Sequence, residues 1–210
     1  MKTDTHTKLI NAGPGIIVDT IEETIDGRND AETLKVTYTA RAEVAHKHLI
    51  GGWEDCLDAV RVGHLHIHDC VMECGPRTRV FVTAKGGGRL HIFEDITLRG
   101  KPRWWAFSFG DWTLYNARPD MPPMREVILR RVKREDGRRF LVLQILCDRV
   151  VLEDTRAVTI NLRGLARLWF WILRKTRRKD PRAEQPIPPW LTEEKALTGG
   201  VPHVDSASSS

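Results

Sequence analysis

Three histidines alternate along one short stretch of this sequence: His64, His66 and His68. Successive side chains of a β-strand point to opposite faces, so all three would project from one face. Zinc and related metals use imidazole and thiolate ligands, and Cys70 and Cys74 follow closely. The intervening Leu65 and Ile67 favour an inward position, however, and the paired spacings of zinc sites are absent. We therefore predict histidines that face solvent, and no metal site.

A group of aromatic residues is the second candidate: Trp104, Trp105, Trp112 and Tyr115. Lys101 and Arg103 lie beside this group, just before Trp104. Exposed aromatic rings stack on sugar faces or fill a protein interface, whereas buried rings pack a core. All three roles remain open, and a glycan is one partner that the group would suit.

Two other motifs exclude function classes. Gly86-Gly87-Gly88 is not followed by Gly-Lys-Ser/Thr or by a helical pattern, so it predicts a tight corner rather than a nucleotide-binding loop. The sequence has no Gly-x-Ser-x-Gly motif, so a serine hydrolase of that type has no support.

The most apolar stretch spans residues 162–173 and precedes the basic run 174–179. One helical face collects its apolar residues: Leu165, Leu168, Trp169, Ile172 and Leu173. We predict an amphipathic helix that is too short to span a bilayer. It would cap an open end of the fold or bind a partner. A membrane surface is the alternative that we do not favour, because the fold requires a cap and does not require a membrane.

The elements that position these residues are short β-type runs separated by Gly, Asp, Asn and Pro. Crossover helices are absent between them, which argues against alternating β-α-β architecture. The predicted strands are 34–39, 57–62, 65–68, 79–83, 90–93, 96–98, 104–109, 126–132, 140–146, 150–152 and 157–160.

An internal repeat discriminates among all-β folds. Residues 65–72 (LHIHDCVM) align without a gap on residues 90–97 (LHIFEDIT), an offset of 25. Each copy contains two apolar residues two apart, then polar residues, then another apolar residue. This pattern predicts a strand, a sharp corner and a second strand, with coils stacked so that Leu65 and Ile67 lie over Leu90 and Ile92.

Composition fits one soluble globular domain with tails: 210 residues, 41% hydrophobic, 29% charged and a net charge of +5. The basic excess lies in 130–139 and 163–182 and could meet nucleic acid, acidic glycan or an acidic protein, none of which is singled out. Four irregularly spaced cysteines predict reduced thiols, and no secretion signal is visible. We predict an arm (1–15), a β-helix domain (16–162), an apolar and basic segment (163–179) and a Pro/Ser-rich tail (180–210).

Several segments together resemble the pectate-lyase-like right-handed parallel β-helix superfamily, of the small kind found in bacteriophage particles. Residues 53–61 (WEDCLDAVR) and 64–72 resemble an aspartate-rich strand that precedes a coil, and 79–87 with 90–98 look like the next coil. Residues 101–103 (KPR), Gly110 and Tyr115-Asn116 are similar to the Arg-x-Pro-Arg, Gly, Tyr-Asn segment of pectate lyases. The resemblance covers roughly residues 50–160 and implies an all-β, single-stranded, right-handed parallel β-helix.

In the lyases of this superfamily, acidic residues bind calcium and an arginine removes a proton beside the substrate carboxylate. Carried over by position, this implies Asp55 and Asp58 as the acidic pair, with Lys85 or Arg103 as the cationic group. Calcium is the one cofactor that this alternative would need. The sequence departs from the family pattern where Trp104 and Trp105 stand in place of a further arginine.

Two functions from different classes follow. The first is a structural or interaction protein, a homo-oligomer that contacts other proteins of a bacteriophage virion as a surface, spike or fibre component. It would be made in the host cytoplasm, need no cofactor and bind no specific nucleic acid. This rests on analogy of fold. The alternative is a polysaccharide lyase or glycoside hydrolase acting on acidic glycan.

Overall fold

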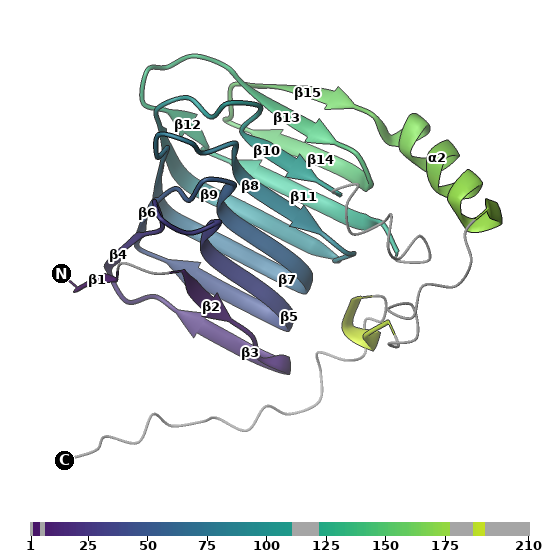
Figure 1. Ribbon diagram of the computed structural model, residues 1–210, viewed down its shortest axis with the longest axis horizontal. Coiled ribbons are helices and arrows are strands. Elements are labelled where there is room, and N and C mark those ends of the chain that lie inside the picture. The colour runs from purple at the N-terminus through teal and green to yellow at the C-terminus, as the bar shows by residue number, and fades with distance from the viewer. Residues whose placement is uncertain (1, 5–6, 111–121, 177–186, 192–210) are drawn as a thin grey trace.

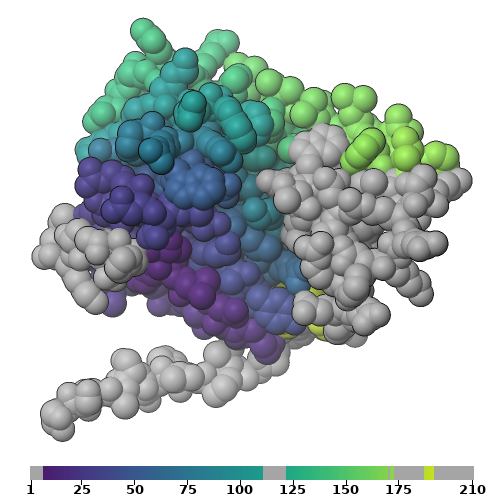
Figure 2. All heavy atoms as spheres, viewed as in Figure 1, coloured from purple at the N-terminus to yellow at the C-terminus, as the bar shows by residue number. Residues whose placement is uncertain are grey.

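The computed structural model describes residues 2–4, 7–110, 122–176 and 187–191. They form a parallel β-solenoid of about five turns (Figure 1), which confirms the all-β, β-helical prediction. Every strand pair among the described residues is parallel. The chain colours in Figure 2 follow one another up the molecule, as stacking of successive coils requires.

Each coil passes through up to three faces, and the one we call face I carries the acidic pair. Parallel ladders join its strands in chain order from one end of the solenoid to the other. The strands are β2 (Lys8–Ile10), the first part of β5 (Glu32–Ala45), the first part of β7 (Asp55–Glu73), β8 (Val80–Lys85), β10 (Phe107–Phe109), β13 (Phe140–Gln144) and β15 (Ala157–Asn161).

Face II carries the three alternating histidines. Its strands are β3 (Gly13–Asp19), the second part of β5, the middle of β7, the first half of β9 (Leu90–Arg99), β11 (Met124–Arg130) and β14 (Cys147–Glu153). Face III closes the triangle. Its strands are β1 (Lys2–Asp4), β4 (Glu23–Asp26), β6 (Lys47–Ile50), the ends of β7 and β9, and β12 (Lys133–Arg134).

Single residues with left-handed backbone make the corners sharp. A residue with φ between 47° and 56° stands at the corner after face II in five coils: His46, Asp69, Asp95, Arg131 and Asp154. An L-residue pays a steric cost there, and aspartate tolerates the conformation better than most because its short side chain hydrogen-bonds locally. One such residue turns the chain without ending its hydrogen-bonded ladder, which is why β7 continues for 19 residues round two corners.

Stacked apolar side chains fill the interior. On face I, one inward ladder runs through five successive coils, and each of its side chains is fully buried: Leu34, Leu57, Val82, Phe107 and Val142. Burying each such side chain stabilises the fold by about 1.5–3 kcal/mol relative to exposure. Because each one is covered by its neighbours above and below, a single coil could not fold alone.

The predicted register of the internal repeat is wrong by one residue. Leu65 pairs with His91 and Ile67 with Phe93, so the true offset is 26 rather than 25. The strands are parallel neighbours, as predicted, but Leu90 and Ile92 do not occupy the inward positions of Leu65 and Ile67. His91 and Phe93 do, and both are buried.

The physical reason is that residues 90–93 (LHIF) offer apolar side chains to both faces of the strand, so alternation alone fits either register. The corner decides, because Asp69 and Asp95 share the left-handed backbone. Burial of His91 is compatible with this register because its imidazole Nε2 donates to the carbonyl of Val62 at 3.0 Å. Burial also lowers the pKa of His91 to about 4, which keeps the ring neutral.

The predicted N-terminal arm is largely part of the solenoid. Residues 2–4, 8–10 and 13–15 lie in β1, β2 and β3, which pair with β4 and β5. Short strands of this kind were not recognised because their apolar residues are few. At the other end the last coil is short, since β14 passes through Asp154 directly to β15 on face I.

Two helical elements follow the last strand in the chain. Helix α2 (Arg163–Thr176) leaves β15 and runs away from the sheets (Figure 1), and the 3-10 turn η2 (Pro189–Leu191) lies against the corner between faces I and II. Trp190 is buried there, with its ring 5.1 Å from that of Tyr38. Residues 187–191, which belong to the predicted Pro/Ser-rich tail, thus pack on their own chain. No helix in the described part of the chain is long and apolar enough to cross a bilayer.

Candidate functional site

The acidic pair sits on the outward side of face I, among lysines. Asp58 stands in the ladder between Lys35 of β5 and Thr83 of β8. Lys35 Nζ lies 3.1 Å from Asp58 Oδ2, and Lys85 Nζ lies 3.1 Å from Asp58 Oδ1. The Thr83 hydroxyl donates to Asp55 Oδ1 at 3.0 Å. The predicted residues Asp55, Asp58 and Lys85 are therefore brought together.

Both carboxyls are buried, but they differ in the charged groups around them. Asp55 is 7% and Asp58 1% exposed. Desolvation by burial, and next the nearby Asp58 charge, raise the pKa of Asp55 from 3.8 to about 8, while Lys85 and the Thr83 hydroxyl oppose the shift. At neutral pH Asp55 is therefore mostly the neutral acid. Asp58 is the carboxylate that two ammonium groups compensate.

This arrangement does not fit calcium. A calcium ion takes six to eight oxygen ligands, with carboxylates as the main source of negative charge. Here the charge of Asp58 already meets Lys35 and Lys85, and the raised pKa of Asp55 keeps that carboxyl protonated at neutral pH. The calcium site implied by the family resemblance is thus not formed by these residues.

Arg103, the other predicted cationic residue, is not among the described contacts of the acidic pair. Its side chain is exposed at a corner, and its backbone N–H donates to the carbonyl of Thr78 at 3.0 Å. Lys35 and Thr83 take part instead. Sequence reasoning missed both because their contact depends on an inter-coil register that only the structure defines.

A second arrangement is a stack of aromatic and cationic side chains at the corner between faces III and I. The Arg79 guanidinium lies 5.3 Å from the ring centroid of Trp53 and 5.0 Å from that of Trp104, so it fills the gap between two tryptophans that lie one coil before and one coil after it. Arg79 Nη1 also lies 3.3 Å from Glu54 Oε1. The ring of Trp105 lies 5.4 Å from that of Trp104.

This aromatic column (Trp53, Arg79 and Trp104) follows from backbone stacking. The backbone N–H of Trp53 donates to the backbone carbonyl of Asp30, and the backbone N–H of Trp104 donates to the backbone carbonyl of Arg79, at 3.0 Å each. Trp104 was predicted as a binding residue and is 54% exposed, whereas Trp53, 38% exposed, and Arg79 were missed. Their spacings of 26 and 25 residues, close to one coil, are the sequence signal that would have found them.

A small hollow lies beside Trp104, at the C-terminal end of the column, and a larger hollow adjoins it. The small one, of about 130 Å³, is lined by Trp104, Trp105 and three cationic side chains: Lys101, Arg134 and Arg139. The other, of about 600 Å³, is lined by four basic and two acidic side chains, among other residues: Lys133, Arg134, Arg138, Arg156, Glu135 and Asp154. Arg134, which is paired with Asp136, lines both, so the hollows adjoin. Basic side chains outnumber acidic ones in each lining, which makes both walls positive. We call the column and both hollows the aromatic–basic surface.

The other predicted binding residues are placed as follows. Trp105 is half-buried and belongs to the wall of the smaller hollow. Trp112 and Tyr115 lie outside the described residues, as does the side chain of Leu173.

The predicted cap does not lie over the end of the solenoid. Helix α2 contacts the body through Ala166, which is fully buried, and through Arg167, whose Nη2 lies 2.8 Å from Asp148 Oδ1. Leu165 and Leu168 are 66% and 57% exposed, and Trp169 and Ile172 are also exposed. The apolar stripe of the helix therefore faces outward. The prediction that it binds a partner stays a prediction.

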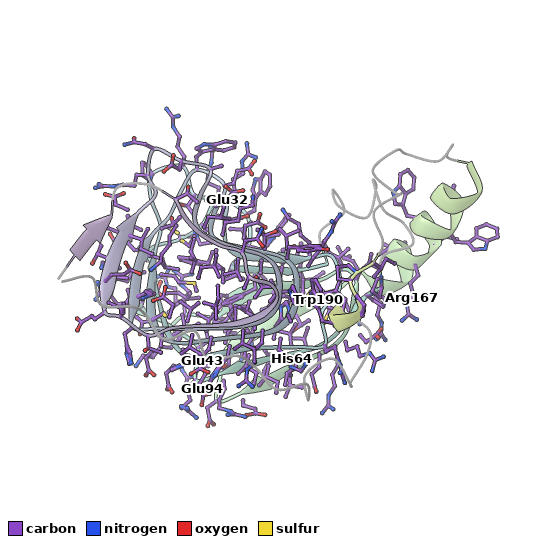
Figure 3. All side chains as sticks on the ribbon, turned by 90° about the horizontal axis from the view of Figure 1, so that it is seen from below. Glu32, Glu43, His64, Glu94, Arg167 and Trp190 are labelled. Atoms are coloured by element: carbon purple, nitrogen blue, oxygen red, sulfur yellow. The ribbon has the colours of Figure 1, made fainter. Side chains whose placement is uncertain are left out.

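The alternating histidines point outward from face II, as predicted (Figure 3 labels His64 beside Glu43 and Glu94, opposite Glu32). All three are partly exposed. Cys56, Cys70 and Cys147 are buried free thiols and Cys74 is partly buried, which agrees with the predicted reduced state.

Comparisons of this chain with models of protein families, with curated proteins and with solved structures find no match. The β-solenoid is therefore established by the structure, while function is inferred from the surfaces described above.

Proposed function

We propose that this protein is an interaction protein without enzymatic activity, which binds acidic glycan through the aromatic–basic surface. In this proposal it is an oligomeric surface, spike or fibre component of a bacteriophage virion. The observation that supports recognition most directly is the column of Trp53, Arg79 and Trp104 beside two hollows with a positive wall.

The chemistry of that surface suits an acidic sugar chain. Indole rings offer flat apolar faces against which sugar C–H groups pack, and guanidinium groups bind carboxylates with two parallel hydrogen bonds. Because Arg79 lies between the two tryptophans, their orientation is set before a ligand arrives, which lowers the entropic cost of binding. A parallel ladder running through the whole solenoid keeps this surface in one shape.

The assembly part of the proposal is supported by the two ends of the solenoid. Leu9, Val18 and Ile21 are exposed near one end, and Val158 and Ile160 near the other. Among the described residues, β15 pairs on one side only, with β13. An apolar strand edge of this kind is normally covered, and we propose a second copy of the chain as its cover. Light scattering should then show an oligomer that Val158→Lys dissociates. A monomeric wild type would contradict this.

Titration of the full chain with polygalacturonate and with a neutral glucan, followed by calorimetry, tests the recognition. We expect binding to polygalacturonate that weakens with added salt, because the wall is cationic. Trp104→Ala and Arg79→Ala should each weaken it about tenfold or more, on the order of one hot-spot residue. Trp171→Ala, which removes an exposed tryptophan of α2, is the matched control and should bind as the wild type does. Equal binding of both polymers, or an unaffected Trp104→Ala, would refute the proposal.

The second candidate is a glycoside hydrolase or polysaccharide lyase. One observation favours it: the raised pKa of Asp55 beside Asp58, since an acid and a base in one site is the arrangement of glycosidases. Burial of both side chains and the two lysines on Asp58 weigh against it. Reducing ends or unsaturated products formed by the wild type and lost in Asp55→Ala would establish this alternative.

A further inference from the structure

We propose that the outer side of face II carries a binding site for a divalent transition-metal ion, with zinc as the typical occupant, formed by Glu43, His66 and His68. One ligand atom from each residue lies within 4.8 Å of the others. Two imidazoles and a carboxylate are a ligand set that zinc uses when a further position is left for water. The proposal is independent of glycan binding.

The ladder brings the three ligands together. Glu43 of β5 pairs directly with His66 of β7, and His68 follows on the same face. The rings of His66 and His68 lie 4.4 Å apart, centroid to centroid, with their planes inclined by 33°, so these two neighbours on one strand face lie close together. Sequence reasoning missed Glu43, which precedes His66 by 23 residues and reaches it only through the coil stacking.

A neighbouring carboxylate prepares His68 for a metal ion. His68 Nδ1 lies 2.8 Å from Asp69 Oδ2, a contact that places the ring proton on Nδ1 and leaves the lone pair on Nε2. That Nε2 atom is buried and has no hydrogen-bond partner among the described residues. Its neighbour is Glu43 Oε1 at 3.5 Å. A carboxylate behind a ligating histidine is the usual second partner in zinc sites, and the left-handed corner at Asp69 positions it here.

The surrounding charges favour a cation. Three carboxylates contact the two imidazoles: Glu43, Asp69 and Glu94, the last at 3.3 Å from His66 Nε2. Arg130 and Arg131 bind Glu94, so the negative charges of Glu43 and Asp69 remain for a metal ion. His46, at 6.1 Å from the His68 ring, adds a further imidazole nearby. Figure 3 shows Glu43 and Glu94 on the same side of the solenoid.

Titration of the metal-free full chain with zinc chloride at neutral pH, by calorimetry, tests the site. We expect one saturable ion per chain. His68→Ala should weaken binding at least tenfold, and Glu43→Gln should also weaken it. Asp69→Asn, a change in a positioning residue, should weaken it about 10–100-fold. It should also alter the visible spectrum of bound Co²⁺ without lowering the melting temperature of the metal-free protein.

His48→Ala is the matched control. His48 also contacts a glutamate, with its Nε2 3.0 Å from Glu73 Oε2, but it belongs to no metal-ligand cluster among the described residues. This variant should keep wild-type zinc affinity. The site is refuted if the wild type shows no saturable binding, or if a His66→Ala/His68→Ala double variant binds as tightly as the wild type. Should the histidine variants fail to fold, Glu43→Gln and Asp69→Asn still decide, because both side chains are partly exposed.

Discussion

Strand β7 builds two groups of ionisable side chains, one on each side of a corner at Arg61, where the backbone is left-handed (φ 56°). On face I, Asp55 and Asp58 are buried, and the flanking coils supply Lys35 and Lys85. On face II, His66 and His68 are partly exposed, and the flanking coils supply Glu43 and Glu94. The same ladder therefore places opposite charges beside the acids and further acids beside the histidines.

This difference in burial and in neighbouring charge indicates different roles for the two faces. A buried charged side chain whose neighbours carry the opposite charge forms part of a buried ion pair. Removing one partner of such a pair destabilises the fold, because the other charge stays buried with less compensation. Histidine and glutamate side chains that lie close together at the surface contribute little to stability, but they can bind a metal ion. Face I is thus expected to govern stability, and face II to govern metal binding.

The largest effect is expected from Asp58→Ala. It removes the carboxylate that lies 3.1 Å from both ammonium groups, while Lys35 keeps its contact with Glu32 Oε1 at 3.0 Å, so we expect the free energy of unfolding to fall by about 3 kcal/mol. The figure is at the lower end of the range for buried pairs because the side chains of Lys35 and Lys85 are 33% and 21% exposed. Urea denaturation at pH 7 measures it.

The matched change on face II is His66→Ala, which should alter the free energy of unfolding by no more than about 0.5 kcal/mol, as for most surface substitutions. If both variants lose the same stability, the proposed difference between the faces is wrong. If Asp58→Ala loses nothing, water solvates the two lysines despite their partial burial.

The second effect concerns pH. Asp55 has a pKa of about 8 in the native state against an ordinary value of 3.8. Below about pH 4 the carboxyl is protonated in both states and costs nothing. Between about pH 4 and 8 only the unfolded state loses the proton, so native stability falls as pH rises. Asp55→Asn removes this dependence and should raise the free energy of unfolding relative to the wild type at pH 9.

Melting temperatures of the wild type and Asp55→Asn across pH 4–9 give the measurement. The two curves should coincide near pH 4 and separate as pH rises. Parallel curves would mean that Asp55 ionises normally in the native state, and this would also remove the observation that favours a hydrolase.

The fold could be predicted from sequence because its signals are local and repeated. Short apolar runs, polar corners and the likeness of residues 65–72 to 90–97 require only composition and spacing. Register could not be predicted, since LHIF at 90–93 satisfies both faces of a strand. The useful signal was the corner aspartate, present at Asp69 and Asp95, whose left-handed backbone fixes the alignment.

The sites were predictable only in part, for the same reason. Asp55, Asp58 and Lys85 were found by resemblance to a family, which transfers positions without needing the register. Their partner Lys35 and the metal ligand Glu43 each lie one coil earlier, opposite Asp58 and His66. A one-residue error in register turns such partners to the opposite face of the strand, so the apolar alternation alone could not pair them.

The smallest effect tests the hydrogen bond that links the acidic pair to the next coil. Thr83→Val keeps the shape of the side chain but removes the hydroxyl that donates to Asp55 Oδ1 at 3.0 Å. We expect a loss of about 1 kcal/mol in the free energy of unfolding, typical of one hydrogen bond. The loss should be greater above pH 8, where Asp55 is ionised and the hydroxyl stabilises its charge. In an Asp55→Asn background the extra loss at high pH should vanish. If the extra loss persists in that background, the Thr83 hydroxyl acts on some group other than Asp55. The acidic pair would then contact β8 only through Lys85.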